Sequence, residues 1–223
     1  MFNFILNILK LIKRTIIATL RYYNIYRPNY NLSSELNFNS KKDNDFIKEK
    51  IKKSKLFFEY GSGNTTLFAN KHNIPVISVE SDKSFYKVLK KKIQSRYVLY
   101  DFGIVDYYSR PLHRIFKINS NISMNYCYHI FKDRKNYKIL PDLILIDGRY
   151  RVLCAIAVHE FLKFYDDSEL PTIILDDYLN RKNYSILENF YNVKLINRIA
   201  ILSPILKKMN FDELKYKYIN DAN

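Results

Sequence analysis

Short apolar runs alternate with helical segments through the middle of the chain, and this alternation restricts the possible folds more than any other feature. It predicts strands at 56–60, 76–80, 97–101, 143–147 and 172–176, and helices at 65–72, 84–95, 151–164 and 181–190. Strands that are separated by helices pair in parallel, with helices covering both faces of the sheet. Two later apolar runs, 193–196 and 200–202, indicate an antiparallel hairpin at the end of the sheet. The predicted fold class is therefore α/β, a doubly wound sheet that is mostly parallel.

The length and composition of the chain support one folded domain. Its 223 residues, of which 48% are hydrophobic, are enough to build a core without disulfides or a structural metal. We predict that residues 41–223 form this domain, beginning with a helix at 41–53, and that residues 1–40 form an N-terminal helix and a connector. The connector at 22–40 is rich in Asn, Tyr and Pro without a sustained period, so no regular element is expected there.

Residues 2–20 form an apolar segment that Lys10, Lys13 and Arg14 interrupt. A membrane span needs about 18 or more apolar residues in succession, and a signal peptide carries its charges ahead of the apolar region, so neither is predicted. The apolar residues recur at helical spacing, which predicts an amphipathic helix. Such a helix either packs on the domain or on another copy, or it makes peripheral contact with a membrane, its basic residues toward anionic head groups. The sequence leaves both placements open.

Basic residues outnumber acidic residues by 37 to 22, which gives a formal net charge of +15. A charge of this size usually indicates a polyanionic partner or a membrane surface. This chain is also rich in Asn, Ile and Tyr, a bias typical of the base composition of a genome, and no nucleic-acid-binding module is recognisable in it. Nucleic acid is therefore not an expected partner.

The two cysteines, Cys127 and Cys154, have no His or Cys at the spacing of a zinc site. Unpaired thiols are typical of a reducing compartment. The predicted location is cytoplasmic, peripheral to the inner face of a membrane if the N-terminal helix binds lipid.

Two glycines mark a candidate ligand site after the first predicted strand, in the segment Glu59-Tyr60-Gly61-Ser62-Gly63. Glycine lets the chain turn sharply and approach a ligand closely, and doubly wound folds hold nucleotides at a strand–turn–helix of this kind. Glu80 ends the next strand, 21 residues beyond Glu59, where a carboxylate can accept both hydroxyls of a ribose.

The residues around this turn argue against a dinucleotide. Thr66 stands where the G-x-G-x-x-G pattern has its third glycine, and no phosphate-binding loop for nucleoside triphosphates is present in the sequence. Glu59 would repel a diphosphate, whereas it can pair with the ammonium group of a methionine moiety.

Glu-x-Gly-x-Gly followed by an acid at the second strand resembles the first two motifs of class I S-adenosylmethionine-dependent methyltransferases, which have a Rossmann-like fold. Residues 141–149 and 172–178 are similar to the fourth- and fifth-strand motifs of that class. The string from Asp147 to Ala155 is similar to a bacterial methyltransferase-like group found near polysaccharide genes and to plant glucuronoxylan O-methyltransferases. The resemblance implies that S-adenosylmethionine is bound by Glu59, Tyr60, Gly61, Ser62, Gly63, Thr65, Thr66, Glu80, Ser81 and Asp147.

The same resemblance implies an enzyme that O-methylates a hydroxyl group of a glycan or glycolipid precursor. One alternative is an RNA or protein methyltransferase, which only the basic charge supports. Another is a non-catalytic, methyltransferase-like binding protein held at a membrane through residues 1–20.

Three carboxylates, those of Asp147, Asp176 and Asp177, are expected to converge where the fourth and fifth strands end. They would repel one another unless a cation or protonation relieves them. The arrangement is similar to the Mg²⁺ site of catechol-type O-methyltransferases, although Asp177 stands where that site has Asn. We therefore predict Mg²⁺ or another divalent cation at this position.

Residues beside these carboxylates are candidates for contact with the acceptor. Arg149 and Arg151 either bind an acidic acceptor through their guanidinium groups or pair with Asp147 or Asp177 to hold the loop. Tyr178 and Arg181 are expected on the opposite wall, and His113 is a candidate general base. The predicted catalytic residues are Asp147, Asp177 and Arg149.

Overall fold

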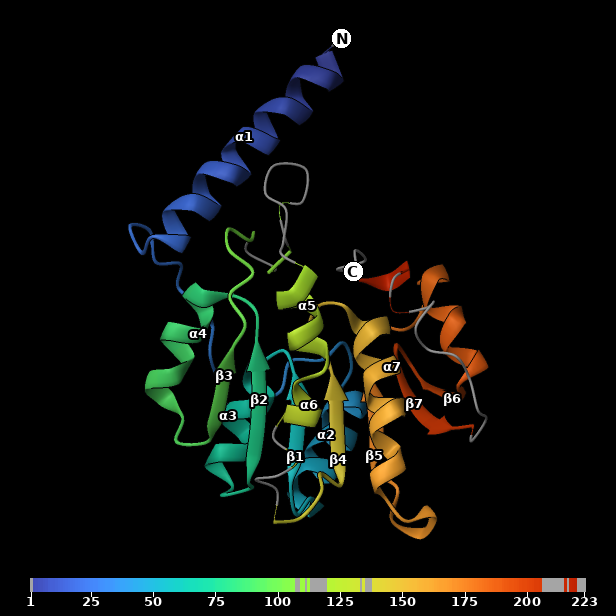
Figure 1. Cartoon of the computed structure of the whole chain (residues 1–223). Coiled ribbons are helices and arrows are strands. Elements are labelled where there is room, and N and C mark those ends of the chain that lie inside the picture. Colours follow the sequence, from blue (N-terminus) through green and yellow to red (C-terminus); the bar gives the residue numbers. More distant parts are fainter. Residues whose placement is uncertain are drawn as a thin grey trace.

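The computed structural model describes residues 2–106, 109–110, 112, 120–132, 134, 138–205, 215 and 217–219. A seven-stranded sheet in the order β3-β2-β1-β4-β5-β7-β6 forms its centre (Figure 1). The strands are β1 (Phe57–Tyr60), β2 (Val76–Glu80), β3 (Arg96–Leu99), β4 (Leu143–Ile146), β5 (Thr172–Leu175), β6 (Tyr191–Ile196) and β7 (Ile199–Pro204).

The first five strands pair in parallel, and β7 pairs antiparallel with both β5 and β6. This confirms the predicted α/β, Rossmann-like sheet with a C-terminal antiparallel hairpin. Because β1 lies between β2 and β4, the strand order reverses there, and the carboxyl ends of these strands border the crevice in which doubly wound folds bind ligands.

The helices cover both faces of the sheet. The α-helices of the domain are α2 (Lys41–Lys53), α3 (Asn64–Lys71), α4 (Lys83–Leu89), α5 (Ser120–Cys127), α6 (His129–Lys132) and α7 (Arg151–Phe161). Short 3-10 turns are η1 (Lys90–Lys92), η3 (Leu162–Phe164), η4 (Asp167–Glu169) and η5 (Lys182–Asn189).

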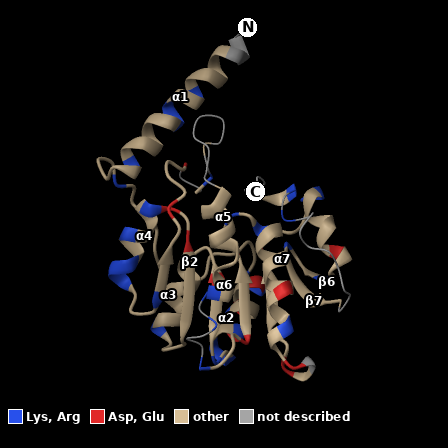
Figure 2. Ribbon diagram, viewed as in Figure 1, with Lys and Arg blue, Asp and Glu red and all other residues tan. Residues whose placement is uncertain are grey.

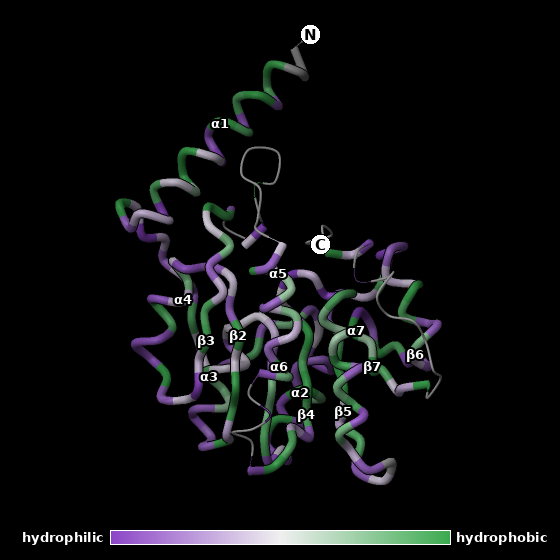
Figure 3. The backbone as a smooth tube through the Cα atoms, in the orientation of Figure 1, coloured by the Kyte–Doolittle hydropathy of each residue, from purple (hydrophilic) through white to green (hydrophobic). Residues whose placement is uncertain are grey.

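Successive residues of each strand enter two different cores. Phe57 of β1 packs with α2 and α3 on one face, whereas Phe58 and Tyr60 pack with α5, α6 and α7 on the other. Both central strands are buried along their whole length, and β4 is accordingly a continuous apolar run, whereas β1 carries one buried acid, Glu59. Figure 3 shows these hydrophobic strands at the centre of the molecule.

Two segments differ from the prediction. α5 and α6 lie between residues 102 and 139, where no helix or strand is predicted, and Tyr126, Cys127 and Ile130 are buried there against the core. The segment expected as a helix at 181–190 forms the 3-10 turns of η5 instead. Both segments are stabilised by burial against the rest of the domain, and the periodicity of the local sequence does not reveal this burial.

The N-terminal helix α1 (Phe2–Tyr22) projects from the end of the molecule at which the parallel strands have their carboxyl ends (Figure 1). Its last turns attach it to the domain, because Ala18 and Arg21 are buried there and Arg21 pairs with Asp82 at the start of α4. Within the described residues, none of the helices combines the length and the apolar character that a membrane crossing requires.

Candidate functional site

A cavity of about 860 Å³ lies at the carboxyl ends of β1, β2, β4 and β5. This volume is within the range of small-molecule sites, roughly 300–1,000 Å³. The predicted site residues that line it are Gly61, Ser62, Gly63, Glu80, Ser81, Asp147, Arg149, Arg151, Asp177 and Arg181. The fold therefore brings residues from four strand ends into one cavity, as the sequence predicts for a doubly wound sheet.

The floor of the cavity is the contact between the turn after β1 and the turn after β4. Gly61 has a φ of 87°, and a Cβ atom added to it would lie 2.7 Å from the backbone of Gly148. A Cβ atom on Gly148 would lie 1.9 Å from the hydroxyl oxygen of Tyr126. Only glycine fits at both positions, because a side chain at either one would push the two turns apart.

Glu80 lies at the cavity, and its carboxylate accepts hydrogen bonds from five donors, of which the Ser81 hydroxyl, at 3.4 Å, is the most distant. The backbone amides of Ser81 and Asp82 donate to one oxygen, at 2.6 and 2.8 Å. The amide and hydroxyl of Ser62 donate to the other, at 3.2 and 2.5 Å, and the Ser62 hydroxyl also contacts the hydroxyl of Tyr97 at 2.7 Å. Burial raises the pKa of Glu80, although these hydrogen bonds lower it. A carboxylate fixed beside a glycine turn fits a ribose with two adjacent hydroxyls.

Glu59 lies behind the turn and does not line the cavity, so the cavity gives no support to its predicted contact with an ammonium group. Its side chain is fully buried, and it accepts hydrogen bonds from the hydroxyl groups of Thr65, at 2.6 Å, and of Thr66. Strand alternation gives the reason: the Phe58 and Tyr60 side chains face one core, and Glu59 faces the start of α3 on the other side. Burial raises the pKa of Glu59 to about 7, although the threonine hydrogen bonds lower it.

This raised pKa makes Glu59 a source of pH-dependent stability. The folded state holds the proton of Glu59 more tightly than the unfolded state does, so stability falls as pH rises from the ordinary glutamate range through about 7. We expect Glu59→Gln, measured by urea unfolding, to be roughly 1–3 kcal/mol less sensitive to this pH change than the wild type. The same substitution at exposed Glu169 is the control, and an unchanged pH dependence in Glu59→Gln would contradict this assignment.

Three other residues that were predicted to contact the cofactor, Tyr60, Thr65 and Thr66, do not line the main cavity. The Tyr60 side chain lies in the core, where its hydroxyl donates to the carbonyl oxygen of Cys127. Thr66 is buried, and its hydroxyl accepts a hydrogen bond from the amide of Gly63 at 2.9 Å. Thr65 borders a smaller adjoining cavity of about 260 Å³. These residues support the turn. The residues predicted to contact the cofactor that also line the main cavity are Gly61, Ser62, Gly63, Glu80, Ser81 and Asp147.

Arginine side chains neutralise the three carboxylates for which the sequence predicted a metal ion. Arg151 donates to Asp147 at 2.8 Å, Arg198 pairs with Asp176 at 2.9 Å, and Arg181 pairs with Asp177. Arg151 also donates to the backbone carbonyl of Asp176 at 2.6 Å. Across the described residues, no group of three or more His, Cys, Asp or Glu side chains is placed to hold a metal ion. The predicted divalent cation at Asp147, Asp176 and Asp177 is therefore not supported.

The pKa values of Asp147 and Asp177 are shifted in opposite directions. Burial, together with the neighbouring charge of Asp176, raises the pKa of Asp147 well above its usual range, although Arg151 opposes the shift. By contrast, Arg181 and Arg151 outweigh burial and lower the pKa of Asp177. Of these two carboxylates, Asp147 is therefore the better suited to accept a proton near neutral pH.

The two arginines after β4 take different positions. Arg151 is buried and pairs with Asp147, as one of the two predicted alternatives has it, and it also lines the cavity. Arg149 is half-buried, lines the cavity, and has no ion-pair partner in the described part of the chain. Burial and the nearby Arg151 lower the pKa of Arg149, which is the expected effect on a cation without a counter-ion.

Of the remaining candidates, Arg181 lines the cavity but Tyr178 does not. Tyr178 is buried, and its hydroxyl donates to Glu188 at 3.1 Å, so the cavity gives no support to its predicted contact with the acceptor. His113 lies outside the described residues.

Several residues of the cavity wall carry no signal in the sequence. Tyr30, Asn31 and Leu32 come from the N-terminal connector, and Arg198 comes from the turn of the C-terminal hairpin. Neither segment has a motif or a period that indicates a site, because long-range packing brings both to the strand ends.

Neither the protein-family models nor the curated proteins contain a match to this chain. The fold does match solved structures. One is a methyltransferase-like protein from Silicibacter pomeroyi, with a TM-score of 0.68 and 20% sequence identity, over 84% of this chain and 99% of that one. The similarity extends over nearly all of that protein, and it shows a shared fold.

Proposed function

We propose that the protein is an S-adenosylmethionine-dependent methyltransferase that methylates a hydroxyl group of a glycan or glycolipid precursor. The observation that carries this proposal is the single cavity that joins the Gly61–Gly63 turn and Glu80 to Asp147 and Arg149. The fold shared with a methyltransferase-like protein supports it. Binding of the methionine and ribose parts is assigned to the glycine turn and Glu80, and the acceptor to the side of Asp147 and Arg149.

The chain's own residues account for the needs of an O-methylation. When bound, S-adenosylmethionine supplies a methyl group on a positively charged sulfur atom. A hydroxyl group is a poor nucleophile near neutral pH, so the site needs a base. Asp147 meets this need because its raised pKa lets it take the hydroxyl proton, while Arg151 holds its side chain in place. Arg149 binds an acidic group of the acceptor.

Glu80→Ala tests the cofactor assignment. We expect it to weaken binding of S-adenosylhomocysteine by about 1–3 kcal/mol, because hydrogen bonds to a charged group are lost. The measurement is calorimetric titration, followed by transfer of labelled methyl groups to a glycan-rich cell fraction. Glu188→Ala, at a carboxylate outside the cavity, is the matched control.

Unchanged cofactor affinity in Glu80→Ala would remove the assignment of the ribose site. Tight cofactor binding without turnover on any fraction would instead favour a non-catalytic binding protein. Methylation confined to RNA or protein fractions would replace the glycan acceptor.

A further inference from the structure

Helix α1 turns its polar side toward the domain and its apolar side toward solvent. Arg14, Ala18 and Arg21 lie on one side of the helix, where Arg14 pairs with Asp106 and the other two are buried. A helix that packs on its own domain does the opposite and buries its apolar side. The placement of α1 therefore leaves an apolar surface without a partner in the described chain.

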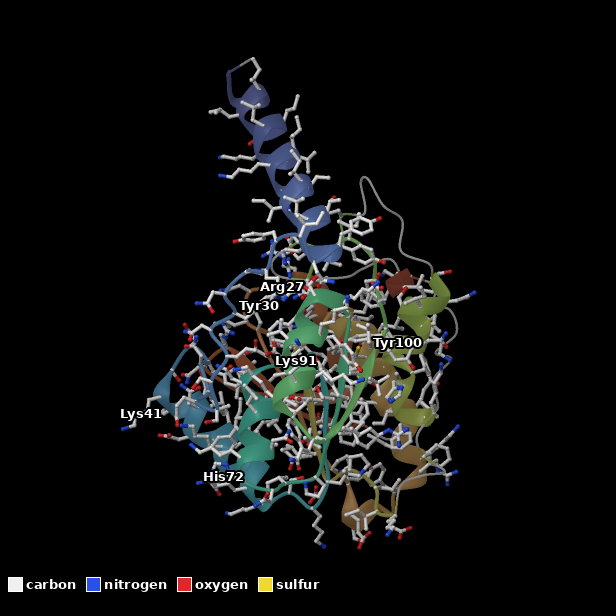
Figure 4. All side chains as sticks on the ribbon, turned by 90° about the vertical axis from the view of Figure 1, so that its left-hand side faces the viewer. Arg27, Tyr30, Lys41, His72, Lys91 and Tyr100 are labelled. Carbon is white, nitrogen blue, oxygen red and sulfur yellow. The ribbon has the colours of Figure 1, made fainter. Side chains whose placement is uncertain are left out.

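This apolar surface is a continuous stripe. Ile5, Leu9, Ile12 and Ile16 follow one another at helical spacing and are 48%, 57%, 50% and 54% exposed. Leu6, Ile8 and Ile17, which are also exposed, widen the stripe on both sides. Figure 4 shows the side chains of α1 standing clear of the rest of the molecule over most of its length. Contiguous apolar patches of this kind mark protein or membrane interaction sites.

The charged side chains around the stripe are all basic. Residues 1–34 contain five basic side chains and no acidic one, and Figure 2 shows basic but no acidic residues on α1. At the base of the helix, a second cavity of about 770 Å³ is lined by Arg27, Lys87, Lys90 and Lys91 and by no acidic residue. Figure 4 places Arg27 directly below α1 and Lys91 farther down, on the neighbouring segment.

Exposed aromatic and aliphatic residues extend the surface beyond the end of the helix. Tyr23, Ile25 and Tyr26 are 63%, 73% and 49% exposed in the turn that follows α1. Tyrosine is the residue type that favours the boundary between hydrocarbon and water, because its ring is apolar and its hydroxyl is polar.

We propose that α1 docks on an anionic lipid surface, with the stripe from Ile5 to Ile16 inserted and the basic side chains near the head groups. A second copy of the chain fits less well. A coiled-coil seam is narrower than this face, and Lys13 beside the stripe would find no acidic side chain on an identical helix. Because Tyr30, Asn31 and Leu32 line the main cavity, docking would hold that cavity close to the lipid surface.

Sedimentation of the full chain with vesicles tests this proposal. We expect binding to vesicles of equal parts phosphatidylcholine and phosphatidylglycerol, and little binding to phosphatidylcholine alone. Leu9→Asn with Ile12→Asn should weaken binding about tenfold or more, because two half-exposed apolar side chains no longer enter the bilayer. Lys10→Gln with Lys13→Gln should weaken it several-fold and reduce its dependence on salt.

The matched control is Ile139→Asn with Leu195→Asn, which makes the same change at two similarly exposed positions away from α1. Circular dichroism and S-adenosylhomocysteine affinity report whether each variant is folded, independently of lipid. Wild-type binding by the Leu9 and Ile12 variant, or equal binding to neutral vesicles, would overturn the proposal. A dimer that this variant dissociates, with no lipid binding by the wild type, would assign the face to a second copy instead.

Discussion

Arg21→Met is expected to lower the free energy of unfolding by about 3–5 kcal/mol, because it leaves a buried carboxylate without its counter-ion. The Arg21 and Asp82 side chains are 1% and 3% exposed, and their charged atoms lie 2.5 Å apart. Arg21 also donates to the hydroxyl of Tyr30 at 2.8 Å. Methionine keeps the length of the side chain, so the loss reports the charge more than the packing.

The effect should depend on pH in a defined direction. Burial raises the pKa of Asp82, and Arg21 is the largest influence that lowers it. Without Arg21 the pKa rises further, so the penalty is largest at neutral pH and diminishes as Asp82 takes up a proton in mild acid. Urea unfolding at both pH values measures this difference. Arg21→Met with Asp82→Asn should be less destabilising than Arg21→Met alone.

The control is Lys53→Met, which removes the cation of an exposed pair with Glu49 and should have little effect on stability. A loss of less than about 1 kcal/mol in Arg21→Met would mean that water already compensates Asp82.

The sequence predicts the order of the elements well, because each strand of the sheet contains apolar residues and is separated from the next strand by a helix or a turn. The predicted and observed limits of β2, Val76–Glu80, are identical, and Pro75 and Ser81 flank this run on either side. The short apolar runs of η5 and α5 are less informative, since helix, 3-10 turn and loop can all bury such residues.

Ten of the predicted site residues line the cavity, but the sequence does not fix the partners of its charged groups. Asp147 and Arg151, like Asp177 and Arg181, are four residues apart, a spacing at which ion pairs form. This spacing can be read from the sequence, and it favours arginine partners over a metal ion for Asp147 and Asp177. The pairing of Asp176 with Arg198 was not available, because it depends on how the C-terminal hairpin folds back beside β5.

Glu59 shows the same limit at one residue. The strand period of two indicates that Glu59 faces away from Phe58 and Tyr60. It does not reveal that the hydroxyl groups of Thr65 and Thr66 reach back to the carboxylate once α3 begins. A motif identifies the acid, and only the three-dimensional arrangement assigns it to the turn rather than to the ligand.

Arg149→Met is expected to reduce kcat/KM for an acidic glycan acceptor by about a hundredfold, because a charge-assisted contact of about 3 kcal/mol is lost. The loss should appear mainly as a higher KM, since a contact that binds acceptor and transition state equally does not change kcat. S-adenosylhomocysteine affinity should stay close to that of the wild type, because Glu80 and the glycine turn are intact. Labelled methyl transfer and calorimetry measure the two quantities on the same preparations.

A carboxyl-reduced form of the same acceptor separates an acceptor contact from a structural role. If Arg149 binds the acidic group, the wild type should prefer the acidic form to the carboxyl-reduced form, and Arg149→Met should treat the two forms alike. Arg149→Lys should recover part of the preference, since lysine keeps the charge but not the planar fork. Equal loss of activity on both forms would assign Arg149 to holding the loop between Asp147 and α7. An unchanged preference would place the acidic group elsewhere in the cavity, with Arg110 and Arg181 as the next cations to replace.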